Sequence, residues 1–311
     1  MKSKHLHIET PLIESLPLAQ AIEGRVWLKM EALQPTGSFK LRGIGYACKK
    51  NVEQGATEFV SSSGGNAGIA VAYSGRKLGI PVTVVVPEST SKNAIKAIDQ
   101  QKAKVIIQGK NWNDSHKYAL DISKTGSAYI HPFDDPILWK GHSTIIDEVV
   151  QQGLIPDITV LSVGGGGLLC GVIEGLVKNN LSNVPVVAVE TKGADSLSAS
   201  LKCGYLMELD DITSIATSLG AKKVAKNAYE WCHNHEVISH VVSDREALDA
   251  CFQFSQDHRI LVEPACGASL AAVYEPINRL KKEKNILVIV CGGGGVSISQ
   301  LEEWNNKLSN K

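Results

Sequence analysis

The run Gln34-Pro-Thr-Gly-Ser-Phe-Lys-Leu-Arg42 places a lysine, Lys40, between an aromatic residue and a glycine-rich surround. A lysine amine has an ordinary pKa of about 10.4, so it attacks a carbonyl only when burial or a neighbouring cation disfavours its charged form. Phe39 and Leu41 can supply the burial, and Arg42 can supply the cation. We therefore interpret Lys40 as a candidate imine-forming amine. The competing interpretation is a solvated lysine at a strand end, the usual state of a lysine.

The length and charge of the chain favour a small-molecule partner. At 311 residues the chain is long enough for two lobes or one large α/β unit, and two lobes leave a cleft between them. Lysine plus arginine total 32, as do aspartate plus glutamate, so no net charge attracts nucleic acid or an anionic membrane. A neutral or zwitterionic substrate fits this balance.

The cysteines and the N-terminus favour a cytoplasmic protein. Seven cysteines are widely spaced and form no Cys-x-x-Cys pair, which argues against a zinc site and against a disulfide framework. The N-terminus lacks the apolar core of a signal peptide, and no apolar run is long enough to span a bilayer. We expect a protein of the reducing cytosol with no membrane segment.

Short apolar runs alternate with helical segments along the chain, a pattern typical of parallel strands covered by helices. We expect an α/β fold of open parallel sheets with right-handed crossovers. The predicted strands are Val26–Lys29, Glu58–Ser61, Val82–Val86, Val105–Ile107, Ile158–Ser162, Val184–Glu190 and Ile286–Val290. The predicted helices are Asn66–Leu78, Lys92–Gln101, Asn113–Lys124, Leu168–Lys178, Asp244–Asp257 and Cys266–Leu280.

Three glycine-rich turns follow predicted strands: Ser61–Gly68, Gly164–Leu169 and Cys291–Val296. Ligands of open parallel sheets bind beyond the carboxyl ends of the strands, so the three turns indicate one ligand held on several sides. The glycines Gly164 to Gly167 open a helix, where free backbone N–H groups bind phosphate. The chain has no Gly-x-Gly-x-x-Gly and no Gly-x-x-x-x-Gly-Lys-Ser/Thr motif, which favours a single phosphate monoester over a dinucleotide or a nucleoside triphosphate.

The other two turns offer different chemistry. The segment Ser62–Asn66 carries hydroxyls and free amides that suit an amino-acid carboxylate, and the Asn66 amide can reach a phenolic oxygen. Plain N-capping of the helix by Asn66 is the competing interpretation. Cys291 can face a heteroaromatic nitrogen as a weak, uncharged partner. The other six cysteines are expected to be small buried apolar residues.

A lysine for an imine, a phosphate turn and a carboxylate nest together describe pyridoxal phosphate with an amino acid. The sequence resembles the fold type II pyridoxal-phosphate enzymes, which share the fold of the tryptophan synthase β subunit. Within them it resembles the serine/threonine dehydratases, closest to the animal-type L-serine dehydratase and serine dehydratase-like branch. The resemblance covers nearly the whole chain, from Thr10-Pro-Leu12 onwards. Its further motifs are Ser-Phe-Lys-x-Arg-Gly43, Ser62-Ser-Gly-Gly-Asn-Ala-Gly68, Pro132-Phe-Asp-Asp-Pro136, Trp139-Lys-Gly-His142, Ser162-Val-Gly-Gly-Gly-Gly-Leu-Leu169 and Leu261-Val-Glu-Pro-Ala-Cys-Gly267.

The resemblance implies two open parallel-sheet domains with the cofactor in the cleft between them. The large domain comprises residues 1–39 and 143–311, and the small domain comprises residues 40–142. Lys40 carries the cofactor as an internal aldimine and takes the Cα proton as the catalytic residue. The implied cofactor-binding residues are Phe39, Lys40, Asn66, Gly164, Gly165, Gly166, Gly167, Leu168, Ser218, Cys291 and Gly292. The implied substrate-binding residues are Ser63, Gly64, Gly65, Asn66 and Ala67.

The resemblance also implies a monovalent cation, with K⁺ as the candidate, beneath the phosphate turn. The matching positions are Gly164, Glu190, Ala194, Ser196, Leu219 and Ala221. Pairing of Glu190 with a nearby donor is the competing interpretation. Two departures from the family pattern concern rate and substrate preference: Gly294 and Gly295 follow Cys291-Gly-Gly where relatives often have Asn or Ser, and Gly64 replaces an alanine of some relatives.

The activity implied is that of a pyridoxal-phosphate dependent L-serine and L-threonine dehydratase, which releases ammonia and gives pyruvate or 2-oxobutyrate. Serine racemase and the β-replacement synthases share the fold and remain alternatives, as does a weakly active cofactor-binding paralogue. A homodimer is implied by the resemblance alone. A serine hydrolase is disfavoured because no Gly-x-Ser-x-Gly elbow is present.

Overall fold

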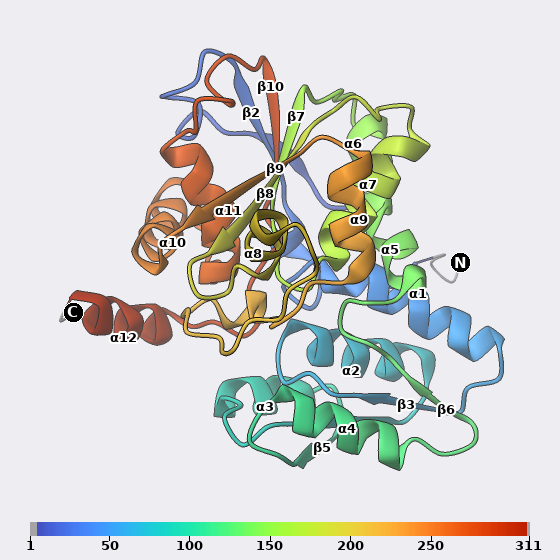
Figure 1. Cartoon of the computed structure of the whole chain (residues 1–311). Coiled ribbons are helices and arrows are strands. Elements are labelled where there is room, and N and C mark those ends of the chain that lie inside the picture. The colour runs from blue at the N-terminus through green and yellow to red at the C-terminus, as the bar shows by residue number, and fades with distance from the viewer. Residues whose placement is uncertain (1–4, 310–311) are drawn as a thin grey trace.

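A computed structural model of the chain describes residues 5–309, and two separate β-sheets organise this part of the sequence (Figure 1). All neighbouring strands are parallel except the first pair, which is antiparallel. The larger sheet has six strands in the order β1 (Leu12–Glu14), β2 (Arg25–Lys29), β10 (Asn285–Ile289), β7 (Ile158–Ser162), β8 (Val186–Thr191) and β9 (Val237–Val242). The smaller sheet has four strands in the order β5 (Lys104–Ile107), β4 (Val82–Val86), β3 (Glu58–Ser61) and β6 (Ser127–Tyr129).

Helices cover both sheets. The α-helices are α1 (Lys40–Glu53), α2 (Asn66–Leu78), α3 (Lys92–Asp99), α4 (Trp112–Ile122), α5 (Pro136–His142), α6 (Thr144–Gln151), α7 (Gly167–Lys178), α8 (Ser196–Cys203), α9 (Lys226–Asn234), α10 (Asp244–His258), α11 (Pro264–Tyr274) and α12 (Ile298–Ser309), and two short 3₁₀ helices are η1 (Glu31–Leu33) and η2 (Thr217–Leu219). Figure 1 shows α10 and α11 on one side of the larger sheet and α6, α7 and α9 on the other. Helix α2 lies between α1 and the smaller sheet.

The central strands are apolar on both faces because helices pack on both sides of each sheet. Every residue of β4, β7 and β8 is buried. This burial explains why the strands read as continuous apolar runs rather than as alternating ones. The predicted α/β class with open parallel sheets is confirmed.

The sequence predicted β3, β4, β7 and α2 with the bounds that the structure gives. It missed β1, β6 and β9, because β1 and β6 have three residues each and β9 is a half-buried edge strand with Ser-His at its centre. It also missed the helices α5, α6, α8, α9 and α12, and it missed α1, in which Gly43 and Gly45 weaken the helical signal. The predicted helix Cys266–Leu280 is wrong at its end: α11 stops at Tyr274, since Pro276 disfavours helical backbone in the residue before it.

The expectation for the cysteines is confirmed in one respect and wrong in another. All seven cysteines are free. However, Cys203 is exposed and Cys232 is half-buried, so the expectation of buried apolar cysteines fails at these two positions. Cys203 is the last residue of α8, whose end faces solvent, and Cys232 lies on α9.

Residues 1–4 and 310–311 of the predicted large domain, and with them the start of the N-terminus judged for a signal peptide, lie outside the described residues. The predicted boundaries of the two domains stay a prediction. Between residues 5 and 309, no helix has both the length and the apolar character that crossing a bilayer requires.

A buried ionic cluster joins the start of α1 to the larger sheet. The fully buried guanidinium of Arg42 donates to both oxygens of Glu31, at 2.6 and 2.7 Å, and to both oxygens of Glu148, at 2.6 Å each. The buried amine of Lys29 donates to Glu148 at 2.6 Å. Thr10 closes the cluster, because its hydroxyl donates to Glu31 at 2.6 Å. Two cations and two carboxylates therefore balance inside the protein.

Replacement of Glu148 by leucine should destabilise the fold by about 3–5 kcal/mol at pH 7, because Lys29 and half of the Arg42 guanidinium lose their counter-charge in a buried site. The measurement is urea unfolding of wild type and variant. Burial raises the pKa of Glu148, but the hydrogen bonds from Arg42 and Lys29 lower it overall. The ion pairs therefore stabilise fully above the ordinary carboxyl pKa of about 4.3, and the difference between the two proteins should shrink as the pH falls below it.

Glu53→Leu is the matched control, because Glu53 pairs with Lys50 on the exposed face of α1. This control should leave the unfolding midpoint unchanged. Equal stability of Glu148→Leu and wild type at pH 7 would contradict the role given to the cluster.

Candidate active site

The segment before Lys40 is fixed against the third glycine turn. Ser38 and Gly292 form an isolated antiparallel bridge. The Phe39 N–H donates to the Cys291 carbonyl at 3.0 Å, and the Gly293 N–H donates to the Gly37 carbonyl at 2.9 Å. Gly292 has a φ of 121°, and a Cβ there would collide with the Gly37 carbonyl, so only glycine permits this pairing. Lys40 thus starts α1 directly after a segment whose backbone is hydrogen-bonded to the third glycine turn.

The amine of Lys40 is half-buried and points away from the ionic cluster. It donates to the Pro132 carbonyl at 2.7 Å and lies 5.1 Å from the centroid of the Phe39 ring. Burial lowers the pKa of Lys40 to about 8, although Cys291 and Glu263 raise it in part. About a tenth of the amine is therefore neutral at pH 7. The interpretation of Lys40 as a solvated strand-end lysine is wrong.

The expected role of Arg42 as the cation beside Lys40 is also wrong. Its guanidinium is turned into the cluster with Glu31 and Glu148, which neutralise it. Burial alone lowers the pKa of the neighbouring amine. The sequence could not show that the Lys40 and Arg42 side chains point to different partners, because the two residues occupy one helical turn.

The second glycine turn presents unused donors at the start of α7. Gly166 is the N-cap of this helix, with a φ of 87°, and no side chain caps it. The N–H groups of the predicted phosphate-binding residues, Gly164 to Leu168, have no acceptor among residues 5–309. The Phe133 ring packs against Gly165. The carbonyl of Pro132, the residue before Phe133, accepts a hydrogen bond from Lys40. The glycine turn and the Lys40 amine therefore lie on two sides of the short segment Pro132–Phe133.

The segment from Ser63 to Asn66 lies half-buried at the start of α2. Gly65, not Asn66, is the N-cap, and the Gly65 N–H donates to the Ser63 hydroxyl at 3.3 Å. Ser62 behind it shares a hydrogen bond of 2.6 Å with Tyr129. The interpretation of Asn66 as a helix cap is therefore wrong, and its side chain is left for another partner. Ala67, the last residue of the predicted substrate set, is buried in α2.

The Asn66 side chain reaches across to the elements of the larger sheet. Its Nδ2 donates to Glu263 Oε1 at 2.7 Å, and its Oδ1 accepts from the Gly294 N–H at 3.1 Å. Burial raises the pKa of Glu263 to about 7, although hydrogen bonds from Ser218 and Asn66 lower it in part. No role was predicted for Glu263 from the sequence, although it stands in the motif Leu261-Val-Glu-Pro-Ala-Cys-Gly267.

The thiol of Cys291 is neutral. A hydrogen bond with the Cys266 thiol and burial hold the pKa of Cys291 well above its ordinary value. Gly294 has no room for the polar side chain found in relatives, because a Cβ would collide with the Thr36 carbonyl, whereas Gly295 faces open space. At Gly64, a Cβ would lie 2.6 Å from Cγ2 of Thr90. The departures at Gly64 and Gly294 thus match their surroundings in this chain.

Two of the predicted cation-binding residues, Gly164 and Glu190, lie at the ends of the paired strands β7 and β8, where the Val163 N–H donates to the Val189 carbonyl at 2.8 Å. The buried Glu190 carboxyl accepts from the N–H groups of Leu197 at 2.9 Å and Ser198 at 2.7 Å. Burial still raises the pKa of Glu190 to about 8.

Glu190 therefore pairs with nearby donors, the two backbone amides, as its competing interpretation predicts. The other predicted cation ligands surround the same edge. The Ser196 hydroxyl is buried without a partner among the described residues. Ala194 bridges to Thr191, Gly164 packs against Leu219, and the Ala221 N–H donates to the Leu219 carbonyl at 2.8 Å. Among residues 5–309, no three His, Cys, Asp or Glu side chains gather as metal ligands, so a cation here would depend on carbonyl and hydroxyl oxygens.

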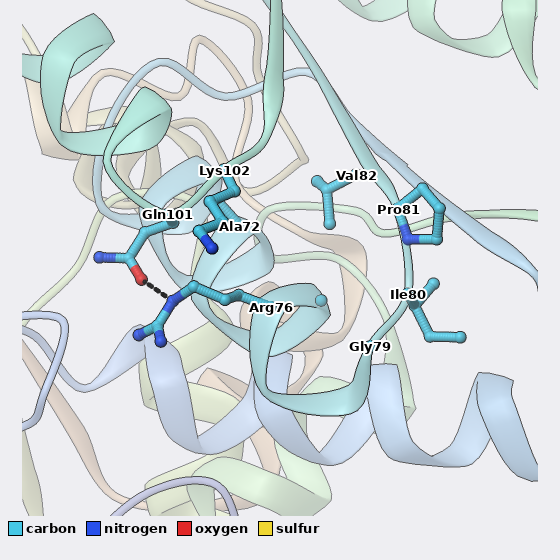
Figure 2. A pocket seen from close by; sticks show the side chains of 9 residues that line it. Ala72, Arg76, Gly79, Ile80, Pro81, Val82, Gln101 and Lys102 are labelled. Atoms are coloured by element: carbon cyan, nitrogen blue, oxygen red, sulfur yellow. Dashed lines mark hydrogen bonds between the residues drawn. The ribbon is translucent and has the colours of Figure 1, made fainter.

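A cavity elsewhere on the surface is separate from this site. It has a volume of about 290 Å³ and lies beside Arg76, Pro81 and Lys102 (Figure 2). Arg76 is held there by a hydrogen bond of 2.9 Å from its Nε to Gln101. None of the predicted site residues lines the cavity, and none lines a second cavity of about 970 Å³ beside His7 and Glu148.

The arrangement around Lys40 fits the parts of pyridoxal phosphate. The amine suits an aldehyde, and the free N–H groups from Gly165 to Leu168 suit a phosphate. The second N–H of Asn66 suits a phenolic oxygen, and the neutral Cys291 thiol suits a ring nitrogen.

The chain is similar to known proteins along nearly its whole length. It is 46% identical to the Rattus norvegicus protein named serine dehydratase-like, over 99% of this chain and 97% of that protein. It is 44% identical to the Homo sapiens L-serine dehydratase/L-threonine deaminase, over 99% of this chain and 97% of that protein. The crystal structure of a fungal L-serine ammonia-lyase from Rhizomucor miehei superimposes with a TM-score of 0.93 at 37% identity, covering 98% of this chain and 99% of that chain.

The predicted fold type II architecture is confirmed by these comparisons. A family model described as "Pyridoxal-phosphate dependent enzyme" matches residues 4–292. Since this match spans far more than half of the sequence, the chain belongs to the pyridoxal-phosphate dependent enzyme family.

Proposed function

We propose that the chain is an L-serine and L-threonine dehydratase, which converts serine to pyruvate and ammonia and threonine to 2-oxobutyrate and ammonia. The observation that carries this proposal is the Lys40 amine, whose pKa burial lowers to about 8 and which donates to the Pro132 carbonyl, next to the residue that packs on the glycine turn proposed to bind phosphate. The printed names of the rat, human and fungal relatives support the same activity.

The cofactor, when bound, withdraws electrons from the Cα of the amino acid and so makes its proton acidic. Lys40 performs the proton transfer. Its neutral amine takes the Cα proton, and the low pKa keeps a usable neutral fraction near pH 7. The Pro132 carbonyl accepts a hydrogen bond from the same amine, which fixes the position of the amine when it is not bonded to the cofactor.

The substrate carboxylate is proposed to bind at the start of α2. The half-buried segment from Ser63 to Asn66 offers the Ser63 hydroxyl and backbone amides at the positive end of the helix. This placement presents the Cα of the substrate toward the cleft side on which Lys40 and Asn66 lie. Loss of the β-hydroxyl as water, followed by hydrolysis, gives the ketoacid and ammonia.

The neutral thiol of Cys291 favours elimination. An acidic residue at the ring nitrogen would keep that nitrogen protonated and prolong the carbanion, whereas the thiol, whose pKa is held high by Cys266 and by burial, carries no charge. With a neutral thiol at the ring nitrogen, the bound cofactor would stabilise negative charge at Cα less, which would favour loss of the hydroxyl over reprotonation. The residues therefore favour dehydration over racemisation.

Three further assignments belong to the same proposal. The domain division at residues 40 and 142 separates the smaller sheet from the larger one. A homodimer is proposed from the family resemblance. A reducing compartment such as the cytosol suits the seven free cysteines.

Substitution Lys40→Ala should abolish the visible absorption that purified protein acquires from pyridoxal phosphate, because no other amine of the site can bond the aldehyde. The measurement is an absorption spectrum after addition of the cofactor and removal of excess. Lys50→Ala, on the exposed face of the same helix, is the control and should keep the band. An unchanged band in Lys40→Ala would refute the role of this lysine.

Side-by-side assays with L-serine, L-threonine and D-serine should give ketoacid from the two L-amino acids and none from D-serine, with residual L-serine unchanged in configuration. The measurement combines ketoacid detection with chiral chromatography. Formation of D-serine would favour a racemase, and consumption only with an added thiol would favour a β-replacement synthase. Bound cofactor without turnover would favour an inactive paralogue.

We also propose K⁺ as a structural cation at Glu190. At constant ionic strength, replacing Li⁺ by K⁺ should raise the thermal midpoint of the wild type, since an ion bound only to the folded state stabilises it. The same exchange, made above the Glu190 pKa of about 8, should leave Glu190→Gln unaffected, because the ionised carboxylate is the charged ligand of the proposed set. An equal rise in both proteins would show that the ion acts elsewhere.

A further inference from the structure

The Asn66 amide is clamped by two partners of opposite hydrogen-bonding character. The Gly294 N–H can only donate, and Glu263 Oε1 accepts from the amide on the other side. Nδ2 must therefore face Glu263 and Oδ1 must face Gly294, so a flipped amide would lose both bonds. Nδ2 carries two hydrogens, and only one of them is used among the described residues.

Glu263 is placed by structure that converges on the same point. It is the N-cap residue of α11, and its backbone N–H donates to the Gly292 carbonyl at 3.3 Å. Its carboxyl is hydrogen-bonded by Ser218 and Asn66 and interacts with the charge of Lys40. All three of these residues belong to the predicted cofactor-binding set. A carboxyl removed from water is costly unless it is hydrogen-bonded, and here both of its partners are residues of the site.

The clamp also joins the two halves of the molecule. Asn66 begins α2 beside the smaller sheet, whereas Glu263 and Gly294 follow elements of the larger sheet. Asn66 and Glu263 are 197 residues apart in the sequence, and Asn66 and Gly294 are 228 residues apart. The orientation of one amide therefore depends on both halves being in place.

We propose that Glu263 is a positioning residue, whose carboxylate fixes the direction of the Asn66 amide and so keeps the second Asn66 N–H free for the phenolic oxygen of the cofactor. The inference rests on the proposed function, because it takes Asn66 as a cofactor-binding residue. It assigns Glu263 no proton transfer to the substrate. Its effect passes through Asn66 alone.

The test is a double-mutant cycle on cofactor affinity, with wild type, Glu263→Leu, Asn66→Ala and the double variant. The dissociation constant of pyridoxal phosphate is measured by its visible absorption, independently of turnover. Leucine has nearly the volume of glutamate and no acceptor, so Glu263→Leu should weaken binding about five- to tenfold, the effect of one oriented hydrogen bond. In the Asn66→Ala background the same change should weaken binding no further.

Glu263→Gln is the matched control, because its amide oxygen can still accept from Asn66 Nδ2. Its affinity should stay within about twofold of wild type. Thermal unfolding of each cofactor-free variant shows whether it is folded, and a Glu263→Leu protein that does not fold is replaced by Glu263→Met in the cycle.

Additive effects of the two single substitutions would overturn the inference, since Glu263 would then act without Asn66. An equal loss of affinity in Glu263→Gln and Glu263→Leu would also overturn it, because charge rather than the acceptor would be responsible. If the wild type itself binds no pyridoxal phosphate, the proposed function fails. If the wild type binds and the cycle is additive, only the role of Glu263 fails.

Discussion

The ion pairs of Arg42 with Glu31 and Glu148 are the interaction on which the site depends. They join η1, α1 and α6, and Lys29 extends them into β2. Arg42 lies two residues after Lys40, so the first turn of α1 cannot shift without separating buried charges at a cost of several kcal/mol. The buried ion pairs thereby fix the position of Lys40.

Arg42 and Lys40, two cations of one helical turn, have opposite surroundings. Two carboxylates and two hydroxyls surround Arg42, and the carboxylates hold the pKa of Arg42 above its ordinary value against the effect of burial. Lys40 receives a carbonyl and an aromatic ring, and burial lowers its pKa to about 8. Because the charge of Arg42 is already compensated, it contributes nothing to the neighbouring amine. A pattern of residues along the chain does not reveal which of the two cations has carboxylate partners.

Much of the fold and the chemical parts of the site could be predicted from the sequence. Buried parallel strands such as Val82–Val86 are visible because both of their faces are apolar, and the glycine turns after them are visible because ligands bind at strand ends. Glu263 was missed because its partner, Asn66, lies 197 residues away, and a local pattern shows only a Glu before a Pro. The edge strand β9 and the helix α1 were missed because tertiary packing, rather than periodicity, maintains them.

The pairing of Ser38 with Gly292 determines when, during synthesis of the chain, the support of Lys40 can form. The segment that presents Lys40 is laid on a turn near the other end of the chain, and β2 completes its pairing only with β10. While the chain is being synthesised, Lys40 emerges early but lacks this support until the last strand is available. The burial that lowers the pKa of Lys40 is therefore complete only once β10 has paired with β2 and its following turn has met Ser38.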